Sequence, residues 1–200
     1  MIEHNIIKIG NSHIFYIENH NNGDISVILL HGYNWTSDIW LKSNTIKALD
    51  EIDVNVYAVD IPGFTKSRSS TNSKNFNDEE VIEILYSFII NTVNKHSRLF
   101  LVGASAGGYL ALKFGEKHSS KLTGIIAIAP SELEKVNFSM ISTNIFAIYG
   151  DKDKEVDIAS DKKYFNGRAK IEMINEAGHK CYLDKSIEFN HILREFILKR

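Results

Sequence analysis

The sequence predicts an α/β fold in three layers, with a mostly parallel β-sheet, an antiparallel N-terminal hairpin and no cap domain. After the first two dozen residues, short apolar runs alternate with segments of helical periodicity. Strands that are apolar throughout are typical of parallel sheets covered on both faces. In such three-layer proteins, ligand sites lie at the carboxyl ends of the strands.

The first element that we expect is a β-hairpin formed by residues 5–9 and 12–18. Gly10 and Asn11 lie between the two segments, and both residue types tolerate a positive φ. Residues with β-branched or aromatic side chains flank this turn. The hairpin supplies the antiparallel start of the sheet.

Six apolar runs are expected to form the other strands. They span residues 25–30, 54–61, 99–102, 122–129, 144–149 and 169–174. The segments between them are long enough to hold the helices that parallel pairing requires.

Two of these helices can be placed from their apolar stripes. One follows Asn77, a suitable N-cap, and Glu80 completes a capping box. Its stripe is formed by Ile82, Leu85, Ile89 and Val93. The other helix ends the chain, with Ser186 available as its cap. Its stripe is formed by Phe189, Ile192, Leu193, Phe196 and Ile197.

Composition favours one globular domain over residues 1–200. The chain is 44% hydrophobic and has 23 Lys plus Arg against 25 Asp plus Glu, a net charge of −2. Charge this balanced implies no basic face, so we expect neither nucleic acid nor a membrane as a partner. The one cysteine, Cys181, cannot form an intramolecular disulfide, and the first residues do not resemble a leader. The expected location is therefore the cytoplasm.

The strand expected at 99–102 runs into the sequence GASAGG and then into a helical pattern with Leu110, Ala111 and Phe114. This is a Gly-x-Ser-x-Gly motif in a strand–turn–helix context, which is typical of an exposed nucleophilic serine, here Ser105. A phosphate-binding turn would need Gly-x-Gly-x-x-Gly or a Gly-Lys-Ser/Thr ending, and the run has neither.

A nucleophilic serine needs a histidine as its base and a carboxylate to orient the histidine. Asp151 and Asp153 follow the strand at 144–149, and His179 follows the strand at 169–174. These residues lie just past the carboxyl ends of parallel strands, on the same sheet edge as Ser105. We expect His179 to be the base, and both aspartates are candidates for the acid.

Together, these motifs make the chain resemble the α/β-hydrolase superfamily along nearly its whole length. The matching segments are LHGY at 30–33, DIPGF at 60–64, the serine motif, GDKD at 150–153 and GH at 178–179. The resemblance implies that Asp153 is the acid and that Asp151 orders its loop or is solvated. It also implies a structural role for His31.

The remaining histidines are not expected to take part. His13 falls in a hairpin strand, and the others in polar or helical segments are most simply solvated: His4, His20, His96, His118 and His191. Cys181 follows His179 closely but has no strand–turn–helix context, so we interpret it as a structural thiol.

The oxyanion hole should be formed by two backbone N–H groups, those of Ala106 and Tyr33. Tyr33, Trp35 and Trp40 either shape an acyl pocket or only pack, and the sequence does not decide between the two. The connection at 130–143 is too short for a folded lid. An open site of this kind predicts hydrolysis of short-chain acyl esters, with a small-molecule acyl substrate and neither a metal nor an organic cofactor.

A narrower resemblance is carried by residues 177–185, 188–191 and 58–63. These segments are similar to a subgroup of small, lidless α/β hydrolases that includes an interacting factor of a general transcription initiation factor. The subgroup implies ester hydrolysis, acyl transfer from protein lysine to coenzyme A, or a protein partner. The GASAG motif departs from the subgroup, which leaves its substrate open here. A non-catalytic interaction module on the same fold is a further alternative.

Overall fold

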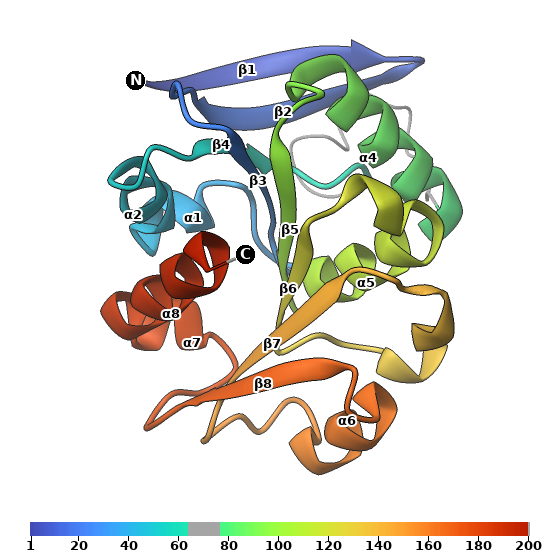
Figure 1. Ribbon diagram of the computed structural model, residues 1–200, viewed down its shortest axis with the longest axis vertical. Helices are drawn as coiled ribbons and strands as arrows, with labels where there is room; N and C mark the ends of the chain where they lie inside the picture. Colours follow the sequence, from blue (N-terminus) through green and yellow to red (C-terminus); the bar gives the residue numbers. More distant parts are fainter. Residues whose placement is uncertain (64–76, 200) are drawn as a thin grey trace.

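The computed structural model describes residues 1–63 and 77–199, which contain an eight-stranded sheet in the order β1-β2-β4-β3-β5-β6-β7-β8 (Figure 1). The strands are β1 (Ile2–Ile9), β2 (Ser12–Asn19), β3 (Ile25–Leu30), β4 (Asn55–Val59), β5 (Arg98–Ala104), β6 (Gly124–Ile128), β7 (Asn144–Gly150) and β8 (Ala169–Ile174). From β4 to β8 every neighbouring pair in this order is parallel. The mostly parallel sheet is confirmed.

The N-terminal hairpin forms around the expected turn. Ile9 pairs with Ser12, which leaves Gly10 and Asn11 as a two-residue loop, and Gly10 has a φ of +57°. Strand β2 then pairs antiparallel with β4, which joins the hairpin to the parallel part of the sheet. Both strands begin earlier or end later than expected because their pairing continues to Ile2 and Asn19.

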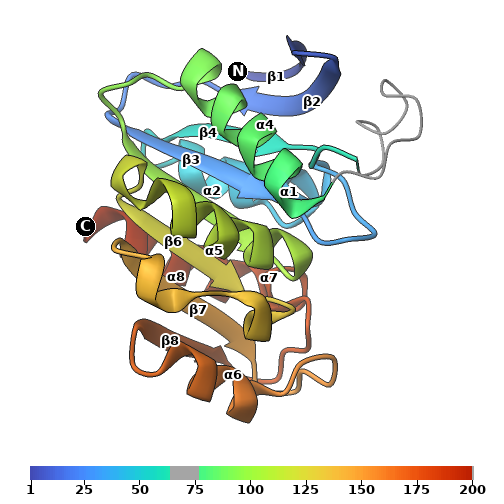
Figure 2. The ribbon, with the colours of Figure 1, turned by 90° about the vertical axis from the view of Figure 1, so that its right-hand side faces the viewer.

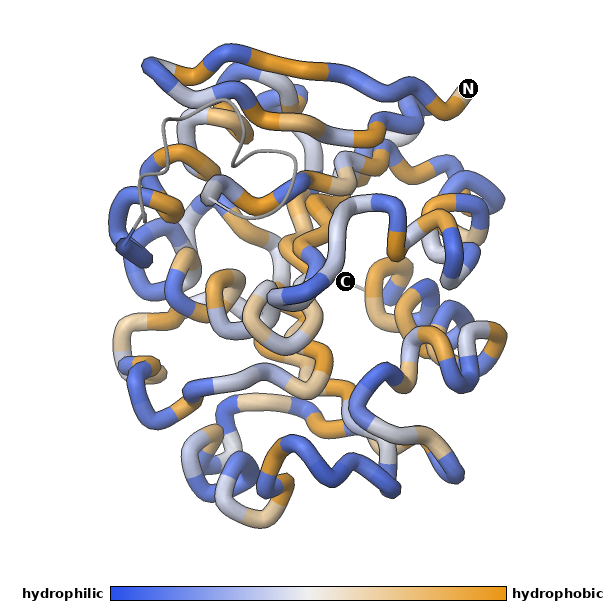
Figure 3. Tube along the Cα trace, turned by 180° about the vertical axis from the view of Figure 1, so that it is seen from behind, coloured by the Kyte–Doolittle hydropathy of each residue, from blue (hydrophilic) through white to orange (hydrophobic). Residues whose placement is uncertain are grey.

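Helices cover both faces of the sheet, so the fold has three layers (Figure 1). On one face lie α4 (Asp78–Thr92), α5 (Ala106–His118) and α6 (Ile158–Phe165), and Figure 2 shows α4 and α5 lying over the strands. On the other face lie α1 (Ile39–Lys42), α2 (Thr45–Asp50), α7 (Cys181–Asp184) and α8 (Ser186–Leu198). Each face has its own buried apolar cluster. In Figure 3 the hydrophobic segments run through the middle of the molecule, and several of the outer turns are hydrophilic.

Helix α4 begins as the sequence predicts. The Asn77 side chain accepts a hydrogen bond from the Glu80 N–H at 2.9 Å, and the Glu80 carboxylate accepts one from the Asn77 N–H at 3.0 Å. The expected stripe is buried at Ile82 and Leu85. Val93 is the exception, because it is the extended C-cap residue and not part of the helix.

Helix α8 begins differently from the prediction. Ser186 is its first residue and Lys185 is the N-cap, and neither provides a side-chain capping hydrogen bond. The expected stripe nevertheless packs inward, with Phe189, Leu193 and Ile197 buried. Burial of this face, rather than a cap, therefore holds the helix on the sheet.

Apolar runs overestimate the length of two strands. Strand β4 ends at Val59 and β6 begins at Gly124, although Ile61 and Leu122 beyond them are also buried. Both residues belong to the buried apolar cluster on the face that α4 and α5 cover, so burial extends beyond the residues that pair in the sheet.

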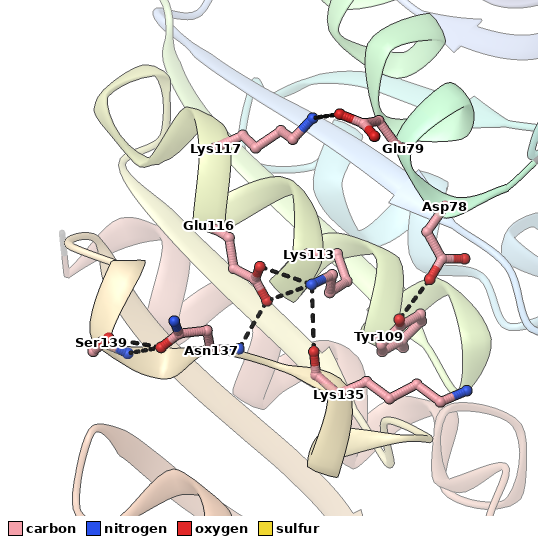
Figure 4. A network of polar contacts seen from close by, with 9 residues as sticks. All are labelled: Asp78, Glu79, Tyr109, Lys113, Glu116, Lys117, Lys135, Asn137 and Ser139. Carbon is pink, nitrogen blue, oxygen red and sulfur yellow. Dashed lines mark hydrogen bonds and ion pairs between the residues drawn. The ribbon is translucent and has the colours of Figure 1, made fainter.

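The connection between β6 and β7 is held against α5 and forms no cap. It contains two 3₁₀ turns, η2 (Leu133–Lys135) and η3 (Phe138–Met140); a third, η1 (Ser119–Lys121), follows α5. Figure 4 shows Glu116 of α5 accepting the Asn137 N–H at 2.8 Å, and Lys113 donating to the Lys135 carbonyl at 3.3 Å. The connection is therefore tied down beside the helix.

Among the described residues, no helix combines the length and the apolar character that crossing a membrane would require.

The capping box gives a first prediction. Asn77→Ala should lower the free energy of unfolding by about 1 kcal/mol, because the Glu80 N–H loses its acceptor. Asn77→Asp, which keeps that acceptor, should stay close to the wild type. Urea unfolding followed by circular dichroism measures both. Equal midpoints for the alanine variant and the wild type would show that the box does not stabilise the helix.

Candidate active site

Ser105 occupies a strained turn between β5 and α5. Its φ is +51° and its ψ is −116°, a region that residues other than glycine rarely adopt. Its N–H donates to the Ile128 carbonyl at 2.8 Å, and its carbonyl accepts the Tyr109 N–H at 3.0 Å. The surrounding backbone therefore fixes the conformation of Ser105, and the residue is partly exposed to solvent.

The glycines of the motif allow backbone to meet backbone at this turn. A methyl group on Gly103 would lie 2.0 Å from the Gly107 carbonyl oxygen. One on Gly107 would lie 2.6 Å from the carbonyl oxygens of both Leu30 and His31. The first turn of α5 is thus pressed against β5 and the end of β3, which directs the positive end of the helix towards the same edge of the sheet.

Asp153 and His179 are brought together at this edge from two different loops. Nδ1 of His179 lies 2.9 Å from Oδ2 of Asp153, whose side chain is fully buried, and the His179 side chain is 11% exposed. Oδ1 of Asp153 accepts the Glu155 N–H at 2.8 Å. A buried carboxylate held this way fixes the orientation of the imidazole and stabilises it when it becomes charged.

Close backbone contact also joins the two loops. A methyl group on Gly150, the last residue of β7, would lie 2.2 Å from the Ala177 carbonyl oxygen. The Lys152 N–H donates to that same carbonyl at 2.9 Å. On the other side, the Gly178 N–H donates to the Asp184 carboxylate at 2.9 Å. Gly150 therefore lets the His179 loop approach Asp153.

The structure distinguishes the two aspartates of the GDKD segment. Asp151 forms an ion pair with Lys152 at 3.4 Å, and its side chain is partly exposed. Asp153, not Asp151, contacts His179. Cys181 is fully buried, and burial raises the pKa of its thiol to about 12. At neutral pH it stays protonated, which suits the structural role expected for it.

No hydrogen bond links Ser105 to His179 among the contacts of residues 1–63 and 77–199. Nε2 of His179, the atom that would take the serine proton, instead lies 3.8 Å from Oε2 of Glu155. Catalytic hydrogen bonds often tighten only when substrate binds. Glu155 was missed from the sequence because it belongs to no motif; its position two residues after Asp153 was the one available signal.

His31 joins the two loops that follow β3 and β4. Its ring is fully buried, with Nε2 accepting the Ile61 N–H at 3.0 Å and Nδ1 donating to the Gly32 carbonyl at 2.7 Å. Burial lowers the pKa of His31, although the Gly32 hydrogen bond and nearby Asp60 oppose the shift. The neutral ring therefore has a structural role. Phe64, the last residue of DIPGF, lies outside the described residues.

The two backbone N–H groups assigned to the oxyanion hole come from the start of α5 and from the loop after β3. Ala106 is the first residue of α5, where a backbone N–H has no acceptor within the helix. Tyr33 belongs to the loop after β3, and its residue is 64% exposed. Trp40 is fully buried against Tyr182, with ring centroids 5.2 Å apart, so it packs in the core and lines no surface pocket.

One other expectation changes. His118 is not simply solvated, because its ring stacks on Tyr86 with centroids 4.3 Å apart. Exposed positions are found for the other four histidines placed in polar or helical segments: His4, His20, His96 and His191.

Over the residues that the structure describes, no group of three or more His, Cys, Asp or Glu side chains is arranged to hold a metal ion.

Comparisons with known proteins agree with this architecture. Residues 25–153 match the family model described as alpha/beta hydrolase fold. The chain is 28% identical to "Protein ABHD14A" of Danio rerio over 179 residues, which cover 88% of this chain and only 65% of that protein. It is 27% identical to the Homo sapiens protein named "Putative protein-lysine deacylase ABHD14B", over 86% of this chain and 82% of that protein. The crystal structure titled as a predicted CIB-like hydrolase from Thermoplasma acidophilum has a TM-score of 0.90 and 26% identity, covering 100% of this chain and 99% of that chain.

Two glycines at the site should respond very differently to substitution. Gly107→Ala should lower the free energy of unfolding by about 3 kcal/mol, since the new methyl group meets backbone atoms that cannot move aside. Gly32→Ala should be tolerated, because its nearest contacts would be 3.6 Å away. Thermal and urea unfolding compare the two variants. A Gly107→Ala protein as stable as Gly32→Ala would contradict the close approach.

Stability should fall as the pH drops below 6.5. The unfolded chain protonates His31 below that value, whereas the folded protein does so only below a lower pKa. This one residue therefore lowers the free energy of unfolding by up to about 1.4 kcal/mol for each unit by which the pH falls. Burial lowers the pKa of His118 as well, so the measurement is made in His118→Gln. A free energy of unfolding that does not decrease between pH 6.5 and 5.5 in that variant would show that His31 titrates normally.

Proposed function

The chain belongs to the α/β-hydrolase fold family, and on that premise we propose that it is a serine hydrolase that cleaves short-chain carboxylic esters. One observation carries the proposal: the buried Asp153–His179 pair and the strained turn at Ser105 follow strands of the same parallel sheet. Parallel strands end at one edge, so three separate loops bring Ser105, His179 and Asp153 to the same edge of the sheet, which supports their assignment as nucleophile, base and acid.

The chemistry follows from these three side chains. Nε2 of His179 takes the proton of the Ser105 hydroxyl, and Oγ attacks the acyl carbon of the ester. The carbonyl oxygen becomes an oxyanion that the backbone N–H groups of Ala106 and Tyr33 stabilise. His179 then donates its proton to the leaving alcohol, which leaves an acyl group on Ser105. Water, deprotonated by the same imidazole, releases the carboxylic acid and restores the serine.

The short connection between β6 and β7 supports small acyl groups as substrates. Its backbone is held on α5 by Glu116 and Lys113, so it supplies no folded wall over the serine. A long acyl chain needs such walls to be buried, because buried apolar area is the main source of its binding energy. A short acyl group has less apolar area to bury, so it loses less binding energy when such walls are absent.

Acyl transfer is the second candidate, because a relative is named as a protein-lysine deacylase. The same three side chains would serve, with an acyl-lysine as the donor and water or a thiol as the acceptor. Turnover of an acetyl-lysine peptide, with and without added thiol, separates this candidate from ester hydrolysis. A non-catalytic module would have no use for a buried acid–base pair, and it should turn over neither substrate.

Hydrolysis of p-nitrophenyl acetate, butyrate and octanoate tests the proposal. We expect kcat/KM to fall with chain length, and Ser105→Ala to lose roughly three or more orders of magnitude in kcat because no acyl-enzyme can form. Ser120→Ala, on an exposed serine at the opposite edge of the sheet, is the matched control and should keep wild-type rates.

Circular dichroism establishes that both serine variants are folded. A folded Ser105→Ala protein with full activity would rule out the assigned nucleophile. Higher kcat/KM for octanoate than for acetate would rule out the short-chain preference.

A further inference from the structure

Trp35 lies beside the nucleophile. A methyl group placed on Gly32 would be 3.6 Å from Cβ of Ser105 and 3.8 Å from Cδ1 of Trp35, so the indole and the serine border the same small space. The Trp35 N–H donates to the Gly32 carbonyl at 3.1 Å, which closes a turn and fixes the backbone of the loop. The indole is only partly buried, in contrast to Trp40. Its ring is therefore available to groups at the mouth of the site.

Two lysines place their ammonium groups on this ring. Nζ of Lys42 lies 5.7 Å from the ring centroid, and Nζ of Lys180 lies 5.2 Å from it. Lys42 ends α1, and Lys180 directly follows the base His179. The cations reach the ring from two distant segments of the chain, and cation–π attraction holds them there rather than extended into solvent.

Neither ammonium group has an ion-pair partner in the part of the chain that the structure describes. Among the described residues no carboxylate forms an ion pair with Lys42 or Lys180, whereas Lys152 nearby pairs with both Asp151 and Glu176. Among the described residues, Glu155 is the carboxylate within ion-pair distance of Nε2 of His179. Within the described residues, Trp35 therefore has two ammonium groups on it that form no ion pair, and the Glu155 carboxylate lies near the imidazole.

We propose that Lys42 and Lys180, held on Trp35, select esters that carry a negatively charged group such as a carboxylate. The inference rests on the proposed ester hydrolysis and names its substrate class. A substrate anion placed towards Trp35 gains two favourable charge interactions, and Glu155 repels the same anion from the side of His179. The lysines bind and orient the substrate, and the bond-breaking steps at Ser105 are unchanged.

Matched pairs of esters that differ by one charge test this selectivity. The 3-acetoxybenzoate anion and its methyl ester place the charge on the leaving group. Mono-(4-nitrophenyl) adipate and its methyl ester place the charge on the acyl group. For each protein the ratio of kcat/KM for the anionic ester to that for the neutral ester is measured at low ionic strength.

For at least one pair, Lys42→Gln and Lys180→Gln should each lower this ratio about two- to fivefold, mainly through KM, and the double variant should lower it further. Lys42→Arg and Lys180→Arg keep the charge and should keep the ratio. Salt at about 0.5 M should lower the wild-type ratio and change that of the double variant little, because screening acts only where the charges remain. Lys121→Gln removes an exposed charge at the opposite edge of the sheet, and should leave the ratio unchanged.

Two results would overturn the inference and leave ester hydrolysis in place. In the first, Ser105-dependent activity is present and the ratio is the same in the double variant as in the wild type for both pairs. In the second, Lys121→Gln lowers the ratio as much as the double variant does, which would make it an effect of net charge. If neither ester of either pair is hydrolysed faster than by Ser105→Ala, the proposed function fails together with the inference.

Discussion

The contact on which the rest of the site depends is the meeting of backbone with backbone at the start of α5. Gly103 and Gly107 leave no room for side chains between β5, the end of β3 and the first turn of the helix. This contact keeps Ser105 at a φ of +51°, a conformation that no intrinsic preference of serine would maintain. It also aligns the helix so that its free N–H groups point to the edge of the sheet where the hydroxyl is held. Without the two glycines, Ser105 and the free N–H groups of α5 would separate.

A second contact of the same kind assembles the other half of the site. Gly150 lets the loop after β8 lie against the loop after β7, and the Lys152 N–H fastens the two together. Asp153 and His179 then face each other over 2.9 Å although 26 residues separate them in the chain. In both halves, a glycine near the carboxyl end of a strand, Gly103 or Gly150, lets another segment of backbone approach because it has no side chain.

Much of this fold follows from local patterns. Apolar runs place the strands because a sheet covered on both faces leaves few polar positions within them, and the capping box at Asn77 sets the start of α4. Strand ends are less well defined, because Ile61 and Leu122 are buried without being paired. The sequence predicts Ser186 as the cap of α8, whereas the observed N-cap is Lys185. The difference arises because packing, not a capping hydrogen bond, determines where that helix begins.

At the site, the sequence identifies residue types but not their partners. Nothing in the order of GDKD distinguishes the two aspartates by chemistry; the resemblance to a family did so, and only Asp153 contacts His179. The contacts of Glu155 with Nε2 and of Lys42 and Lys180 with Trp35 join segments that are distant in the chain, so they are visible only in three dimensions. Trp40 lies five residues from Trp35 and yet belongs to the core, because it falls on the inner side of α1.

The most direct test of an activated serine at this turn is its reaction with a fluorophosphonate. The intact mass of the treated protein gives the number of adducts, and peptide mapping locates them. We expect a single adduct on Ser105, formed much more slowly in His179→Gln because no base takes the serine proton. An unmodified protein, or an adduct on a different residue, would contradict the assignment of Ser105, Asp153 and His179 to a catalytic triad.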